Sequence, residues 1–192
     1  ADNTFLGTNA GRTNTASNNT FVGSSAGTLT LGGARNVFVG TVAGATNSAG
    51  ADNTFIGYNA GNDNTTSNNT FVGSGSGSLN SGGGSNTFVG TLSGAANVGG
   101  ADNTFVGYNA GNDNLVSNNT FVGSGSGSLN SGGGSNTFVG TLSGAANVGG
   151  ADNTFLGTNA GRTNTASNNT FVGSSAGTLT LGGARNVFVG TV

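Results

Sequence analysis

The sequence lacks most of the residues on which protein chemistry depends. Histidine, cysteine, methionine, proline and tryptophan are absent, and so are lysine, glutamate and glutamine. Without histidine, cysteine, lysine or glutamate, no side chain can serve as the base that would activate the many serines and threonines. The absence of cysteine also excludes a disulfide framework and a thiolate metal site. We therefore predict a chain that is not an enzyme and that uses no cofactor.

Charge is scarce as well, with four arginines, six aspartates and a net charge of −2. Four arginines without lysine offer no basic surface for nucleic acid or for an anionic membrane. No apolar run approaches the roughly 20 residues that a membrane helix needs. We therefore expect neither nucleic-acid binding nor membrane insertion. The sequence contains no signal peptide and no initiating methionine, so we expect a mature product, a fragment or an excised piece.

The few aspartates are too dispersed for a strong metal site. The closest match to a calcium-binding turn is the stretch 99–103, which contains one carboxylate. Asp63 and Asp113 lie in Asn-Asp-Asn turns. A plain Asx turn is the favoured interpretation, and a loosely bound ion is the alternative.

The dominant feature of the sequence is a short repeat. The unit reads N-x-F-(V/L/I)-G-x-x-(A/S)-G, and its phenylalanines follow one another at spacings of 16, 17 and 17 residues. The motif phenylalanines are Phe5, Phe21, Phe38, Phe55, Phe71, Phe88, Phe105, Phe121, Phe138, Phe155, Phe171 and Phe188. The motif asparagines are Asn3, Asn19, Asn36, Asn53, Asn69, Asn86, Asn103, Asn119, Asn136, Asn153, Asn169 and Asn186.

A longer period of 50 residues lies over the short one. It divides the chain into blocks 1–50, 51–100, 101–150 and the truncated 151–192, and residues 1–42 are identical to 151–192. We interpret 1–192 as one continuous array. Disorder is the alternative for such a Gly/Ser/Asn-rich chain, but a disordered linker has no reason to keep phenylalanine in register. Neither end carries an atypical polar cap, so we expect an array that was cut from something longer or that joins end to end.

The motif predicts an all-β fold, a parallel β-solenoid of 12 rungs with 16–17 residues each. The run T-F-V is a short strand that places phenylalanine on one face and threonine and valine on the other. Both faces carry apolar atoms, so we expect both to be covered. We also expect a second, weaker strand in the return segment, for example at 28–31 and 78–81. The stack would be about 55–60 Å long. In the alternative architecture, each 50-residue block forms one three-faced turn of a prism with four layers.

Two columns are expected to run along the stack. The phenylalanines form the core, because each buried ring contributes roughly 2–3 kcal/mol. The motif asparagines form an amide ladder, with plain turn formation as the alternative. In the column that precedes those asparagines, Arg35 and Asp52 fall on adjacent rungs and are predicted to pair.

The runs Asn3-Thr4-Phe5-Leu6-Gly7 and 19–23, each followed by Ala-Gly, resemble a repeat of bacterial surface proteins and phage tail-fibre-like proteins. More distantly, they resemble the head repeat of YadA-like trimeric autotransporter adhesins. In that family each N-S-V-A-I-G-like run marks one rung of a parallel β-roll, and three chains pack around one axis. The rung here is longer, and phenylalanine replaces a small residue. The resemblance implies a homotrimer in which the outer strand face meets two partners.

These features together predict a structural role outside the cell. The leading interpretation is the shaft of an extracellular bacterial or phage fibre, a filament or an adhesin stalk, at a cell surface or on a virion. Its partners would be copies of itself, as a homotrimer or an end-to-end filament. One alternative is an adhesive module whose repeated surface, including Tyr58 and Tyr108, binds a host-cell, glycan or matrix ligand. The other is an ice-binding solenoid, because Thr4, Thr20 and Thr54 begin a row of threonines that Val37 interrupts.

Overall fold

The computed structural model describes residues 2–191 and contains twelve short strands in one parallel sheet. The strands follow one another in chain order, and each pairs only with its sequence neighbours. Their bounds are β1 (Thr4–Leu6), β2 (Thr20–Val22), β3 (Val37–Val39), β4 (Thr54–Ile56), β5 (Thr70–Val72), β6 (Thr87–Val89), β7 (Thr104–Val106), β8 (Thr120–Val122), β9 (Thr137–Val139), β10 (Thr154–Leu156), β11 (Thr170–Val172) and β12 (Val187–Val189).

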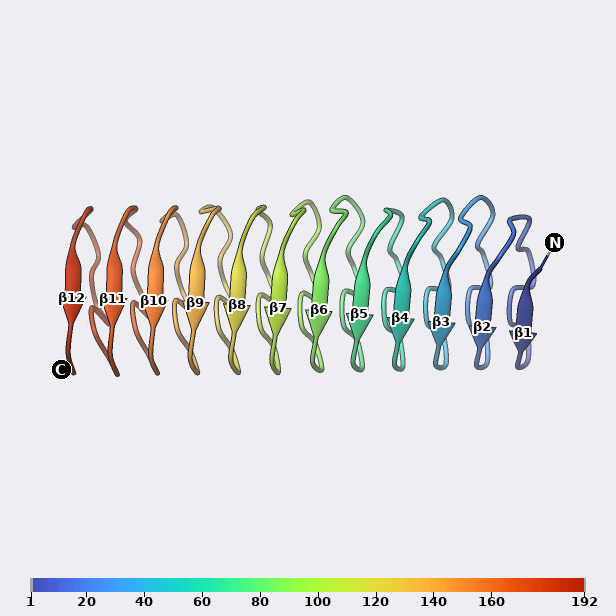
Figure 1. Cartoon of the computed structure of the whole chain (residues 1–192), viewed down its shortest axis with the longest axis horizontal. Coiled ribbons are helices and arrows are strands. Elements are labelled where there is room, and N and C mark those ends of the chain that lie inside the picture. The colour runs from blue at the N-terminus through green and yellow to red at the C-terminus, as the bar shows by residue number, and fades with distance from the viewer. Residues whose placement is uncertain (1, 192) are drawn as a thin grey trace.

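The chain forms a β-solenoid, as the repeat predicts. One strand and the return segment that follows it make one rung, and the rungs line up in a row with the two termini at opposite ends (Figure 1). Adjacent strands pair in register, so that Phe21 lies opposite Phe38 and Thr20 lies opposite Val37. Pairing between β1 and β2, which lie in one 50-residue block, excludes the prism in which a whole block makes a single turn.

The interior is built around the phenylalanine column. Successive rings are stacked with their centroids 4.8–5.0 Å apart and their planes 3–12° from parallel. The ten inner phenylalanines are fully buried. Phe5 and Phe188 depart from the expected core, because each lies in an end rung with a neighbour on one side only and is 39% or 42% exposed.

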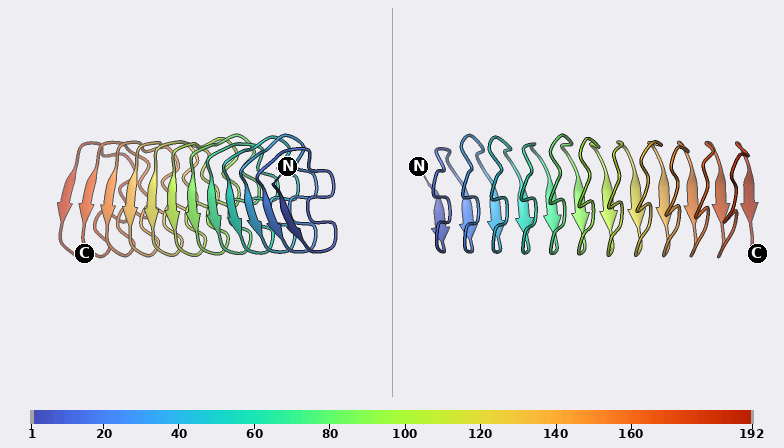
Figure 2. Two further views of the ribbon diagram at one scale, coloured as in Figure 1. Left: turned by 45° about the vertical axis from the view of Figure 1, so that its right-hand side comes forward. Right: turned by 180° about the vertical axis from the view of Figure 1, so that it is seen from behind.

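The expected second strand in each rung is wrong. The return segment consists of turns, and isolated backbone bonds join it to the next rung, such as Gly27 N–H to Ala43 O at 2.9 Å. Gly27 has a φ of 57°, and a Cβ there would lie 2.5 Å from the Phe21 ring. Positive φ at this point curls the chain around the ring, which is incompatible with an extended strand. Figure 2 shows strands along only one side of the coil.

The outer face of the sheet is not covered by the chain itself. In β2 to β11 the central phenylalanine is buried, whereas the two flanking side chains are half-buried or exposed. The expectation that both strand faces are covered therefore fails for the single chain. The alternation of side chains across a strand turns threonine and valine outward in every rung.

Candidate functional site

The described residues offer little for catalysis or for metal binding. Within residues 2–191, no group of three or more histidine, cysteine, aspartate or glutamate side chains could hold a metal ion. Asp63 accepts hydrogen bonds from the Thr46 hydroxyl at 2.7 Å and from the Asn62 amide at 3.1 Å. Its carboxylate therefore has two side-chain partners within the fold, and among residues 2–191 no backbone N–H donates to it, which an Asx turn would require.

The predicted pair between Arg35 and Asp52 is present. The guanidinium Nε and Nη2 donate to the two carboxylate oxygens at 2.6 and 2.7 Å, which makes the contact bidentate. Both side chains are exposed to solvent. The hydrogen bond, more than the charge, lowers the pKa of Asp52 and raises the pKa of Arg35. This pair joins the segments that precede β3 and β4 and confirms the register of the column.

The motif asparagines form a ladder whose donor differs from the expected one. The backbone N–H of each asparagine donates to the side-chain Oδ1 of the asparagine one rung earlier, at 2.8–2.9 Å; Asn36 to Asn19 and Asn53 to Asn36 are examples. In most rungs the side-chain amide instead donates to a backbone carbonyl, as Asn36 Nδ2 does to Gly50 O at 2.9 Å. Near the end of the coil, Asn186 Nδ2 donates to Asn169 Oδ1 at 3.1 Å, which is the expected ladder bond. The side chain thus accepts a bond at the start of the next strand and donates one to a turn. The motif asparagine therefore serves both in a ladder and in turn formation.

Amide-to-amide bonds run along a second column that the sequence analysis did not single out. It lies nine residues after each phenylalanine, and the Nδ2 of one rung donates to the Oδ1 of the rung before it at 2.7–3.2 Å. The bonded asparagines are Asn47, Asn64, Asn80, Asn97, Asn114, Asn130, Asn147 and Asn164. The signal was visible in the sequence, because the same offset carries asparagine in nearly every rung.

Position 30 interrupts this second column. Thr30 is fully buried, and its hydroxyl has no hydrogen-bond partner among the described residues. Its equivalent near the other end, Thr180, donates to Gly177 O at 3.0 Å. Thr30 thus leaves this column incomplete in rung 2, and Asn159 Oδ1 is a second buried polar atom without a partner among residues 2–191.

The outer strand face is a regular surface that runs along all twelve strands. One row contains ten threonines together with Val37 and Val187, and the second row contains only valine, leucine or isoleucine. No charged residue occurs in any strand. Charged side chains do occur elsewhere at the surface, as Arg35 and Asp52 show. The outer strand face therefore differs from the rest of the surface, because it is uncharged and largely apolar.

The return side presents a less regular surface. Tyr58 and Tyr108 are 63% and 60% exposed, as predicted for surface residues. Leu79 and Leu129 are exposed too, but polar residues occupy their position in other rungs, including Thr46 and Asp63. The sequence provides no continuous row of one chemical type here.

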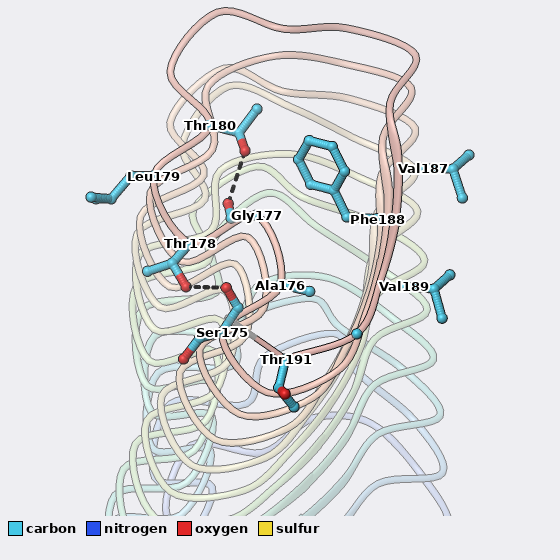
Figure 3. A pocket seen from close by; sticks show the side chains of 11 residues that line it. Ser175, Ala176, Gly177, Thr178, Leu179, Thr180, Val187, Phe188, Val189 and Thr191 are labelled. Atoms are coloured by element: carbon cyan, nitrogen blue, oxygen red, sulfur yellow. Dashed lines mark hydrogen bonds between the residues drawn. The ribbon is translucent and has the colours of Figure 1, made fainter.

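The hollow at the end of the coil is lined by rungs 11 and 12. It has a volume of about 680 Å³ and includes Ala176, Thr180 and Phe188. In Figure 3 the Phe188 ring points into this hollow, while Val187 and Val189 point away from it. In inner rungs the next ring fills the same place, as Phe55 does over Phe38. The hollow is therefore an uncovered section of the core and carries no titratable side chain.

Comparisons of this chain with protein-family models, curated proteins and solved structures find no match. Within residues 2–191 there is no helix with the length and apolar character needed to cross a membrane.

Proposed function

We propose that this chain is a non-catalytic, stiff segment of an extracellular bacterial or phage fibre, filament or adhesin stalk. The observation that carries the proposal is the unbroken repetition of one interface along the coil. Every strand from β1 to β12 pairs in register with the next, and every phenylalanine stacks on its neighbour. Such a molecule is quasi-one-dimensional, and its length is set by the number of rungs.

Rigidity follows from the close contact between rungs. A Cβ at Gly23 would lie 2.5 Å from the Gly40 carbonyl oxygen, so the backbones of adjacent rungs meet without room for a side chain. The asparagine bonds and the ring stack lie beside this contact. Bending the rod would break several of these contacts at once, which suits a spacer that holds a binding tip away from a surface.

Self-association is part of the proposal. The resemblance to trimeric adhesin heads implies three parallel chains, and end-to-end stacking would lengthen the rod. Light scattering on a sizing column at several concentrations, combined with electron microscopy, tests both. We expect elongated particles, with a threefold or concentration-dependent mass if copies associate. Compact particles would overturn the rod itself, whatever their mass.

A second candidate, adhesion through the repeat surface, is favoured by the exposure of Tyr58 and Tyr108. They occupy the same position in rungs three apart, where other rungs carry serine or threonine such as Ser74. Replacing both tyrosines by serine should abolish binding of the soluble chain to cells, glycans or matrix if they form the adhesive contact. Binding that survives the double substitution would exclude them as the contact.

A further inference from the structure

The threonine hydroxyls of the outer face are free, unlike those of the return segments. Within residues 2–191, none of the ten strand threonines uses its hydroxyl in a hydrogen bond to the chain. Thr13 and Thr163, in contrast, donate to carbonyl oxygens of the next rung at 2.7 Å. The strand hydroxyls are therefore available to an external partner that can accept or donate hydrogen bonds.

These hydroxyls are held at a regular spacing. Adjacent strands pair in register, and the rings beneath them repeat every 4.8–5.0 Å. Threonine and valine are β-branched, which restricts χ1, so their methyl groups and hydroxyls have few orientations. The strands stay side by side along the whole coil in both views of Figure 2. The face is thus a two-row array of small groups with nearly constant positions.

The outer face is narrow for a second protein copy, so copies of the rod would associate end to end rather than through this face. Eleven steps of about 4.8 Å and a width of three strand residues give roughly 500 Å². A standard protein interface buries about 800 Å² on each partner. Aromatic side chains and arginine, which are enriched at such interfaces, are absent from the face, because phenylalanine points inward and the arginines lie outside the strands.

Going beyond a structural rod, we propose that the outer Thr/Val face binds ice. The strand hydroxyls follow the rung repeat of about 4.8 Å, so they form a periodic row. Threonine hydroxyls in one row can bond to lattice waters, while the methyl groups and the aliphatic row beside them order the waters between. Each contact is weak, and a row of ten gains strength because all of them are made together.

The test uses the complete 192-residue chain with ice itself as the probe. Thermal hysteresis and uptake into a growing ice hemisphere are measured for three proteins. These are the wild type, a face variant with Thr104→Lys and Thr120→Lys, and a control with Ser81→Lys and Ser131→Lys. All four substituted side chains are exposed, and the two serines lie outside the strands. Circular dichroism and native mass are recorded for each protein.

We expect hysteresis and ice uptake for the wild type and for the control, and loss of both for the face variant. If the lysine face variant fails to fold, Thr104→Val with Thr120→Val keeps the branched shape and should still weaken uptake. A folded wild-type chain without hysteresis or uptake would overturn the proposal while leaving the rod intact. A different result would be a wild type without ice activity and a face variant with a lower native mass. That result would mean that the face makes contacts between copies of the chain.

Discussion

At the scale of single residues, the asparagine columns show how a polar interior becomes stable. The buried amides of the two columns have partners above them, below them or within their own turn, as with Asn97, which donates to Asn80 Oδ1 and to Gly100 O. Amides left without these partners would each cost about 1–3 kcal/mol. The motif asparagine was predictable because it sits beside the strand. The second column was not recognised because its role depends on the path of the return segment.

Thr30→Asn should stabilise the protein. The new amide would donate to Asn14 Oδ1 and accept from Asn47 Nδ2. It would replace the buried Thr30 hydroxyl, which has no partner among the described residues. We expect a gain of about 1 kcal/mol, measured as a higher denaturant midpoint. The control is Thr180→Asn, where the hydroxyl is already bonded to Gly177 O and the site is partly exposed. A loss of stability at position 30 would contradict the role of this column.

Val42 is strained by its backbone. Its φ is 52°, a left-handed conformation that a β-branched residue rarely adopts, whereas the equivalent positions of rungs 4 and 7 hold Asn59 and Asn109. We expect Val42→Asn to raise the free energy of unfolding by about 1 kcal/mol. Val98→Asn, at an exposed position without positive φ, is the control and should change it by less than about 0.5 kcal/mol. Equal effects at both positions would show that the backbone is not the cause.

At the scale of the element, a three-residue strand cannot stand alone, and its neighbours stabilise it. The motif T-F-V predicted the strands and their register correctly, because alternation and the terminating glycine are local signals. The return segment was wrongly expected to contain a strand. Its conformation depends on how closely glycines such as Gly27 approach the Phe21 ring, and this is a contact between segments that the sequence does not display.

Phe88→Ala should destabilise the middle of the coil. The ring is fully buried between Phe71 and Phe105, with centroids 4.8 Å away on both sides. Removing it costs about 3–5 kcal/mol, since the cavity cannot collapse between clamped rungs. Phe5→Ala is the matched control, because that ring has one stacking neighbour and is 39% exposed. Similar losses at both positions in chemical unfolding would argue against a continuous ring stack.

The contact between Arg35 and Asp52 should make stability depend on acid. The pKa of Asp52 is lowered in the folded state, so its contribution is present above the ordinary value of 3.8 and is lost as pH falls through the lower folded value. We expect Asp52→Ser to lower the melting temperature at pH 7 and to match the wild type at pH values below that range. When Arg35 is already replaced by serine, adding Asp52→Ser should no longer change the melting temperature at pH 7. A difference that persists at the lowest pH would mean that Asp52 acts without Arg35.

At the scale of the whole molecule, one chain closes its own core along its length, and apolar groups stay uncovered on the outer strand face, in the end rungs and at single return-side positions such as Leu79 and Leu129. The periodic phenylalanines predicted the solenoid, because their near-equal spacing favours one rung per motif, and the pairing of β1 with β2 excludes the prism alternative. The number of chains in the assembly depends on surfaces whose partners lie outside this chain, and the repeat pattern alone does not fix it.

The central claim is that each motif forms one rung of a single-file stack. Deleting residues 51–100 removes three motifs and joins two blocks that begin with the same sequence, Ala-Asp-Asn-Thr-Phe. The rod should then shorten by about 14 Å, which is three steps of roughly 4.8 Å, and small-angle X-ray scattering measures this through the maximum dimension of the particle. A shortening of only about 5 Å, one layer of β-structure, would contradict the account, because it would mean that 50 residues make a single turn.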